Sequence, residues 1–256
     1  MLSRLVRMPL KQVEVLRTIF AKMVRGARGL AAYHWNDAYY WDRYVRRWDQ
    51  TTDTSSIRIV GEEWGSGRAF AKLVTERASV AYVGLEIGCG AGRVTQYVAP
   101  SFTSLVCCDI SSEMLATAEE TVRGQNVSFI KINGFDLDCL QDNTFDMVFS
   151  HDVFVHFPLE AVFTYYEEIS RVLRPGGICL ISHFSLAIPM NLQAFVKKSR
   201  LYQTQHTTPP HQREYYTSPE SLKIFIESAG LEFFETILIS EDTAQQQHLA
   251  VVARKA

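Results

Sequence analysis

The sequence lacks a marked excess of charge of either sign. Its 256 residues include 26 Lys and Arg against 28 Asp and Glu, which gives a formal net charge of -2. A chain without a general positive field lacks the electrostatic footprint of a nucleic-acid-binding protein. We therefore expect no nucleic-acid partner.

Long apolar runs are absent as well. No segment approaches the roughly 18 consecutive apolar residues that a membrane-spanning helix needs. No cleavable apolar signal is recognisable either, so we expect a cytoplasmic protein.

Cysteines are few, and their spacing is not that of a metal site or of a disulfide framework. All five lie in or beside apolar runs, which is typical of reduced core residues: Cys89, Cys107, Cys108, Cys139 and Cys179. The sequence predicts no bound metal.

Residues 1–29 depart from the overall charge balance, with seven Lys and Arg residues against the single acid Glu14. Apolar residues recur there at roughly helical spacing, which predicts a basic amphipathic helix apart from a break near Pro9. Three interpretations stay open for it. It packs on its own domain or on a homodimer mate, it makes peripheral contact with a membrane surface, or it is an organellar transit peptide.

From Tyr82 onward, apolar runs alternate with helical patterns, which predicts an α/β fold with a mostly parallel, doubly wound sheet. The length fits one domain, which we place at residues 30–256. The last two strands are expected as an antiparallel pair. The expected strands are 82–87, 104–109, 127–132, 145–150, 178–183, 231–239 and 248–254.

A glycine-rich turn follows the first expected strand, in the stretch LEIGCGAG at residues 85–92. Its alternate glycines let the backbone approach a ligand closely, and its acid Glu86 precedes them by two residues. Asp109 lies 21 residues after Gly88, at the end of the second expected strand. A carboxylate there can accept hydrogen bonds from both ribose hydroxyls, so the pattern indicates a nucleoside site.

Five stretches in order resemble the class I S-adenosylmethionine-dependent methyltransferases of the small-molecule type. They are LEIGCGAGRVT (85–95), CCDISSEML (107–115), NGFDL (133–137), NTFDMVFSHDVFVHF (143–157) and RVLRPGGICLIS (171–182). The resemblance implies a Rossmann-like sheet of seven strands in the order 3-2-1-4-5-7-6, with the last strand antiparallel. It also implies S-adenosyl-L-methionine as the cofactor.

Carried onto this sequence, the resemblance implies a set of cofactor-binding residues. Glu86 would hold the ammonium group and Asp109 the ribose, while Ile110 and Met114 would contact adenine. Many members of the family read Gly-Asp-Ala where this chain has Asn133-Gly134-Phe135, so backbone groups or Asp136 would have to contact the adenine amino group. The implied set is Glu86, Gly88, Cys89, Gly90, Asp109, Ile110, Met114, Gly134, Phe135, Ser150 and His151.

Three histidines are candidate catalytic residues, namely His151, His156 and His183. They lie at or beyond the carboxyl ends of the fourth and fifth expected strands, where ligands bind in open α/β sheets. A general base is needed only when the acceptor is protonated, as a hydroxyl is. A purely structural role remains open for each of them.

Two segments are expected to flank the site. Residues 30–80 are rich in aromatic side chains and would form an N-terminal cap, in which an aromatic face attracts the sulfonium. Residues 185–217 would form a lid whose basic side chains favour an anionic acceptor. A packed aromatic helix and a solvated charged surface are the respective alternatives.

The expected activity is methyl transfer to a small organic acceptor, with oxygen as the favoured atom. Methylation of nitrogen or carbon in a small metabolite and cofactor binding without catalysis remain alternatives. An NAD-dependent oxidoreductase is disfavoured by the position of Glu86 and by the later matching stretches. A nucleic-acid amino-methyltransferase is disfavoured because SHDV at 150–153 replaces the Asn/Asp-Pro-Pro-aromatic stretch of that class.

Overall fold

The computed structural model describes residues 35–51, 65–124, 126–205, 214–239 and 247–256. The predicted basic helix of residues 1–29 lies outside these ranges. The helices are α2 (Trp35–Thr51), α3 (Arg68–Thr75), α4 (Thr95–Val98), α5 (Ser112–Thr121), α6 (Leu159–Val172), α7 (Pro189–Gln205) and α8 (Pro219–Ser228). The strands are β1 (Val83–Ile87), β2 (Ser104–Asp109), β3 (Val127–Lys131), β4 (Phe145–Ser150), β5 (Leu173–Ser185), β6 (Tyr216–Thr217), β7 (Leu231–Ile239) and β8 (His248–Lys255).

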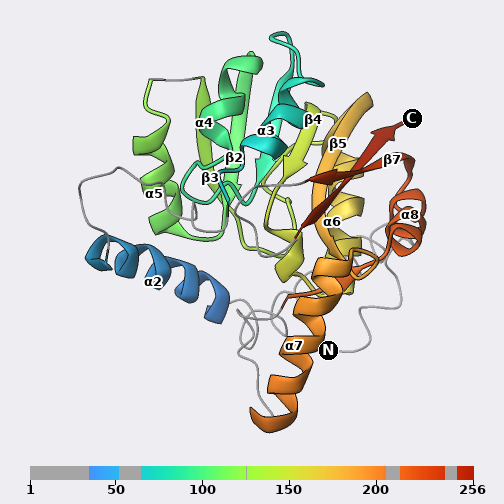
Figure 1. The fold of residues 1–256 in the computed structure, drawn as a ribbon. Coiled ribbons are helices and arrows are strands. Elements are labelled where there is room, and N and C mark those ends of the chain that lie inside the picture. Colours follow the sequence, from blue (N-terminus) through green and yellow to red (C-terminus); the bar gives the residue numbers. More distant parts are fainter. Residues whose placement is uncertain (1–34, 52–64, 125, 206–213, 240–246) are drawn as a thin grey trace, which may run out of the picture.

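The strands form one mostly parallel sheet in the order β3-β2-β1-β4-β5-β8-β7, with β6 paired to β5 outside this path. β8 runs antiparallel to both β5 and β7. Apart from the two-residue β6, this is the predicted order 3-2-1-4-5-7-6, so the predicted fold class is confirmed. The carboxyl ends of the five central parallel strands therefore meet at one edge of the sheet (Figure 1).

Helices cover both faces of the sheet, and each layer has its own apolar core. Buried side chains of α6 and α8 pack on one face, including Tyr165, Ile169 and Leu222. Phe70 and Val74 of α3 pack on the other face together with α4. This burial of both sheet faces explains why the strands read as nearly continuous apolar runs in the sequence.

One expected strand boundary differs clearly from the observed one. The expected fifth strand begins at residue 178, whereas β5 begins at Leu173 and includes the Arg174-Pro175-Gly176-Gly177 stretch. The register between β4 and β5 shifts there, because Phe145 pairs with Leu173 and Met147 with Ile178. A turn-like sequence can thus lie inside a strand as an irregularity, with Gly176 at a φ of 78°.

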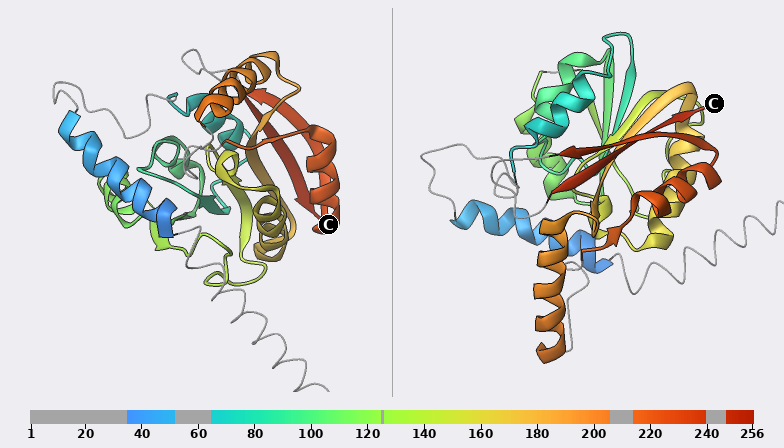
Figure 2. Two further views of the ribbon diagram at one scale, coloured as in Figure 1. Left: turned by 90° about the horizontal axis from the view of Figure 1, so that it is seen from below. Right: turned by 45° about the vertical axis from the view of Figure 1, so that its right-hand side comes forward.

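Two helices extend beyond the layered core at the carboxyl edge of the sheet. α2 lies across this edge and packs against α5, while α7 projects away from it (Figure 2). Several apolar side chains of α7 are exposed, including Met190, Leu192 and Phe195. Among the described residues, no helix combines the length and apolar character needed to cross a membrane.

Candidate functional site

The glycine turn after β1 adopts a backbone that ordinary residues disfavour. Gly88, Gly90 and Gly92 have φ values of 70°, 54° and 86°. A Cβ atom at Gly88 would lie 2.3 Å from Cγ2 of Val153, whereas at Gly90 the nearest atom would be Sδ of Met114 at 4.0 Å. Gly88 is therefore required for close packing, and Gly90 leaves room for a ligand.

Asp109 connects the end of β2 to this turn. Its Oδ2 accepts a hydrogen bond from the Gly90 N–H (2.9 Å), and its Oδ1 accepts one from the Ser111 N–H (2.9 Å). Burial raises the pKa of Asp109, and the two backbone donors oppose that rise. Each carboxylate oxygen still has a lone pair for a further donor, so the group can hold ligand hydroxyls as well as the turn.

Glu86 lies on β1, next to the strand β2 that carries Asp109, and only 3% of its surface is exposed. Its Oε2 accepts hydrogen bonds from Thr95 Oγ1 (2.6 Å) and Cys107 Sγ (3.6 Å). Burial raises the pKa of Glu86 to about 7, despite these two donors. The carboxyl group is therefore poised between its neutral and charged forms near neutral pH, and a ligand cation would favour the charged form.

These groups surround one cavity of about 890 Å³, counted with the space at its open mouth. Its wall comes from the ends of β1 and β2, from the segments that follow β1, β3 and β4, and from α2, α5 and α6. Eight of the predicted cofactor-binding residues line it: Glu86, Gly88, Cys89, Gly90, Asp109, Ile110, Met114 and His151.

Three predicted cofactor-binding residues, Gly134, Phe135 and Ser150, are not part of this lining. Ser150 is buried, and its hydroxyl donates to the Ile87 carbonyl (2.7 Å), which ties β4 to β1. In the loop after β3, Asn133 Oδ1 accepts from the N–H groups of Phe135 (2.7 Å) and Asp136 (3.1 Å). The side chain of Asn133 therefore engages these two backbone donors within the loop itself.

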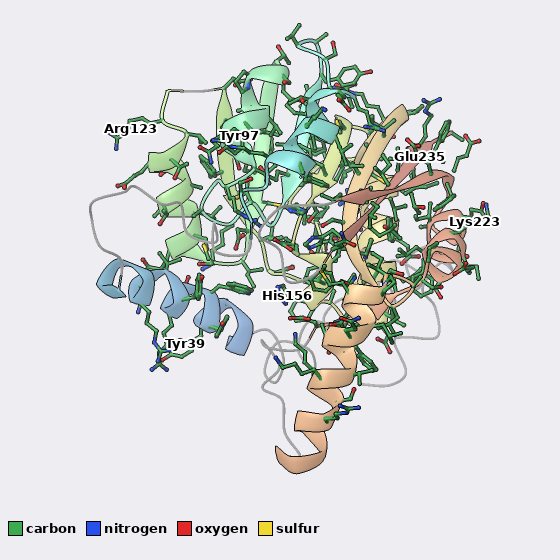
Figure 3. All side chains as sticks on the ribbon, viewed as in Figure 1. Tyr39, Tyr97, Arg123, His156, Lys223 and Glu235 are labelled. Atoms are coloured by element: carbon green, nitrogen blue, oxygen red, sulfur yellow. The ribbon has the colours of Figure 1, made fainter. Side chains whose placement is uncertain are left out.

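Among the candidate histidines, His156 lines the cavity and is only partly buried. It lies beside α2 at the edge of the sheet (Figure 3), with its ring centroid 5.4 Å from that of Trp41. Trp41 lines the same cavity. His156 and Trp41 therefore form an aromatic part of the wall.

His151 also lines the cavity but is buried, stacked on Phe70 with ring centroids 4.5 Å apart. Its Nδ1 lies 3.0 Å from Ser182 Oγ. Burial lowers the pKa of His151 well below its usual range. The ring is therefore neutral at physiological pH and is a weak proton acceptor.

His183 is not part of the cavity lining. Its Nε2 lies 2.8 Å from the Tyr166 hydroxyl, inside the layer between β5 and α6. Burial lowers the pKa of His183 to about 3. The strand was expected to end at His183, whereas β5 continues to Ser185, and the side chain of His183 faces the core.

A charged cluster at the carboxyl edge was not predicted from the sequence. Asp152 Oδ2 lies 2.5 Å from Arg93 Nη2, and Asp152 Oδ1 contacts Nε2 of His248. Arg93 also donates to the Gly65 carbonyl (2.6 Å). Burial would raise the pKa of Asp152, but the neighbouring His248 and the Arg93 guanidinium hold it well below its usual range.

The signals for this cluster are weak in the sequence, because Arg93 and His248 lie 59 and 96 residues from Asp152. His151, Asp152 and His248 also bring possible metal-ligand atoms within 4.8 Å of one another. Each oxygen of Asp152 is already engaged, one by Arg93 and the other by His248. The arrangement is therefore explained as a charge cluster that joins the glycine turn, β4 and β8.

The expected aromatic cap, residues 30–80, is described at α2 and at residues 65–80, where α3 packs on the face of the sheet instead of over the cavity. Asp42 Oδ1 accepts hydrogen bonds from Ser111 Oγ (2.6 Å) and from the Glu113 N–H (3.3 Å) at the start of α5. Arg46 pairs with Glu113 (2.9 Å) on the exposed side. These contacts fix α2 over the cavity, where its Trp41 contributes to the wall.

The expected lid contains α7, but no described residue of α7 lines the cavity. α7 instead projects from the carboxyl edge (Figures 1 and 2). Its Lys198 forms an ion pair with Glu214, which removes one of the basic groups expected to face an anionic acceptor. Residues 206–213 of the expected lid lie outside the described residues.

Comparison with known proteins relates this site to methyl transfer. Residues 85–181 match the methyltransferase domain family. The ubiquinone biosynthesis O-methyltransferase of Methylococcus capsulatus is 29% identical over 114 residues, 44% of this chain and 47% of that protein. Phosphoethanolamine N-methyltransferase 2 of Caenorhabditis elegans is 38% identical over 104 residues, 39% of this chain and 23% of that protein. The match thus spans less than half the length of these curated relatives.

Among solved structures, the fold resembles magnesium protoporphyrin IX methyltransferase from Synechocystis, a structure with bound SAH. The TM-score is 0.64 at 17% identity, covering 86% of this chain and 98% of that one. The strand order and the cavity at the carboxyl edge agree with the match of residues 85–181 to the methyltransferase domain family. The overall fold is that of the methyltransferase from Synechocystis.

Proposed function

We propose that the protein binds S-adenosyl-L-methionine and transfers its methyl group to a small organic acceptor, at oxygen. The observation that carries this proposal is a single cavity that joins a region with carboxylates to a region with aromatic side chains. One region holds Glu86 and Asp109 beside the glycine turn, and the other holds Trp41, His156 and Phe157. A donor and an acceptor can therefore meet inside one cavity.

The donor region fits the chemical groups of the cofactor. The Asp109 carboxylate would accept hydrogen bonds from the ribose hydroxyls, and the buried Glu86 would face the ammonium group. Backbone at Gly88 and Gly90 leaves room for the methionine portion. Ile110 and Met114 would supply apolar contacts to adenine.

When bound, the cofactor supplies a methyl group that is already activated by a sulfonium. The residues of this chain then have to orient the acceptor and exclude water. Well-oriented reactants gain effective concentrations of about 10⁵ M or more, so positioning alone accounts for much of the rate. Trp41, Val153 and Phe157 would hold the acceptor by apolar and aromatic contact.

His156 is the basis for proposing oxygen as the acceptor atom. It combines exposure to the cavity with partial contact with solvent, so it can take a proton from an acceptor hydroxyl and release it. The relatives include an O-methyltransferase and an N-methyltransferase, so they support the general reaction without selecting the atom. Methylation at nitrogen or carbon and cofactor binding without catalysis are the alternatives.

A transfer assay tests the proposal. The full chain is incubated with methyl-labelled S-adenosylmethionine and a panel of small phenols, carboxylic acids and amines. We expect label on at least one hydroxyl-bearing compound. Label on amines alone would contradict oxygen as the acceptor atom, and cofactor binding without transfer to any compound would favour a binding protein.

The basic segment at residues 1–29 supports a separate proposal, that a protein of the cytoplasm makes peripheral contact with anionic membranes. Sedimentation with anionic vesicles, with and without residues 1–29, tests it. Equal partitioning of the two forms would contradict membrane contact. A homodimer held by the same segment would instead lose mass in light scattering when the segment is removed.

A further inference from the structure

Helix α7 combines exposed apolar side chains with charge of a single sign. Four of its apolar side chains are 40 to 46% exposed, namely Met190, Leu192, Phe195 and Val196. The helix contains no Asp or Glu, and its basic residues are Lys197, Lys198 and Arg200. Exposed apolar side chains that gather on one element commonly mark a site of contact with a protein or a membrane.

One side of α7 is fastened to the rest of the domain. Asn191 is fully buried, and its Nδ2 donates to the carbonyls of Ser185 (3.1 Å) and Gln247 (2.8 Å). Further along the helix, Lys198 forms an ion pair with Glu214. Asn191 and Lys198 are seven residues apart, which places them on the same side of the helix. The helix is therefore held by one side, and its other side is exposed.

The exposed side carries Leu192, Val196 and Arg200, which follow one another at intervals of four residues and so form a line. Together with Lys197 they make up the outer surface of α7. Neither Lys197 nor Arg200 forms an ion pair with any residue that the structure describes. The helix projects from the carboxyl edge of the sheet (Figure 2). The outer surface is thus apolar, convex and bordered by unpaired positive charge.

This charge distinguishes between the possible partners of the outer surface. A two-fold dimer through α7 would bring Lys197 and Arg200 against their own copies or against apolar side chains, and both arrangements are unfavourable. Residues 1–29 carry seven basic residues against one acid, so this segment would be repelled as well. A small ligand would need a concave site. An extended anionic surface is the partner that remains.

A lipid bilayer with anionic headgroups matches the outer surface in both of its properties. Apolar side chains of a surface-bound helix enter the boundary between headgroups and acyl chains, and adjoining Lys and Arg residues are attracted to anionic lipids. We propose that α7 docks the protein on an anionic bilayer through its outer surface. The carboxyl edge of the sheet, where the cavity lies, is then near the membrane.

The test is sedimentation of the full chain with two kinds of vesicle, phosphatidylcholine alone and phosphatidylcholine mixed with phosphatidylserine. One variant, Lys197→Gln with Arg200→Gln, removes the unpaired charges. A second variant, Leu192→Gln with Val196→Gln, removes apolar surface. Thermal melting and the binding of S-adenosylhomocysteine measure whether the fold and the cavity are intact, and both should be unchanged in these variants.

Each variant has a matched control elsewhere on the molecule. Ile224→Gln removes an exposed apolar side chain of α8. Lys72→Gln with Arg123→Gln removes two exposed basic groups, on α3 and just after α5. Both controls should bind the vesicles like the wild type, because they leave the outer surface of α7 unchanged.

We expect the wild type to sediment with the mixed vesicles and far less with phosphatidylcholine alone. A basic residue near an anionic membrane surface contributes about fivefold to binding, so Lys197→Gln with Arg200→Gln should bind the mixed vesicles roughly 25-fold more weakly. Leu192→Gln with Val196→Gln should bind about tenfold more weakly or less still, since it removes apolar surface that enters the bilayer.

A wild type that binds neither kind of vesicle would overturn the inference. Equal binding by the wild type and the two α7 variants would overturn it too, because residues 1–29 would then account for any membrane contact. A dimer in light scattering that Leu192→Gln with Val196→Gln converts to a monomer would assign the outer surface to a second copy instead. The proposed function is judged separately, by methyl transfer and by the binding of S-adenosylhomocysteine.

Discussion

At the scale of single residues, we expect Glu86 to couple cofactor binding to the release of a proton. Its pKa rises from 4.5 to about 7 because the carboxyl group is buried. Its contribution to folding stability is thus present below the unfolded value near 4.5, and it is lost as pH rises through about 7. A bound ammonium reverses this preference, because it stabilises the charged carboxylate.

The affinity for S-adenosylhomocysteine should therefore rise about tenfold between pH 6 and pH 8, as the charged fraction of Glu86 grows. Calorimetry in buffers of different ionisation enthalpy should also detect release of a proton on binding at pH 6. Glu86→Gln serves as the control, and its affinity should be weaker and nearly independent of pH. A pH dependence that survives in this variant would assign the proton to another group.

Even the substitution Asp109→Asn, which keeps the shape of the side chain, should weaken cofactor binding. Both carboxylate oxygens accept backbone N–H groups, so an asparagine would point a donor at either Gly90 or Ser111. Asp109→Asn should weaken S-adenosylhomocysteine binding by about tenfold or more, by loss of charged hydrogen bonds. Calorimetry checks this, with the exposed Glu120→Gln as the control that should bind like the wild type.

His156 should affect catalysis rather than cofactor binding. If it is the base for a hydroxyl acceptor, His156→Gln should lower kcat by about 10² or more and leave S-adenosylhomocysteine affinity unchanged. Steady-state kinetics against pH would check this beside His151→Asn and His183→Asn. Near-normal turnover in all three variants would show that positioning is sufficient and that none of them is the base.

At the scale of elements, the Arg93–Asp152–His248 cluster links three parts of the sheet edge. Asp152→Asn would leave Arg93 as an unpaired, largely buried charge, and we expect a loss of about 3 kcal/mol in the free energy of unfolding. Urea denaturation checks this, with the exposed Glu119→Gln as a control. The double variant with Arg93→Met should recover part of the loss, and strict additivity would show that the two residues are not coupled.

Most elements were predictable from the sequence where the signal is local. β1 and β2 read as apolar runs, and Ser111 and Ser218 cap α5 and α8 through their own side chains, which is a local signal at each helix start. The start of β5 was wrong, because the Pro-Gly-Gly stretch is absorbed into an irregular strand. The cluster around Asp152 was missed because its partners meet only after the sheet has formed.

At the scale of the whole molecule, one part of the cavity wall comes from outside the matched domain. Residues 85–181 supply both the donor region and most of the wall, while Trp41 comes from α2 outside the matched domain. Acceptor preference should therefore depend strongly on α2. Its anchor is Asp42, whose bonds to Ser111 and Glu113 hold Trp41 over the cavity.

The binding of S-adenosylhomocysteine to the full chain tests the central claim most directly. Titration calorimetry should give saturable binding with one site per chain and a dissociation constant in the micromolar range, and Asp109→Asn should weaken it. Absence of saturable binding at millimolar ligand, or binding that Asp109→Asn leaves unchanged, would contradict the assignment of this cavity as the cofactor site.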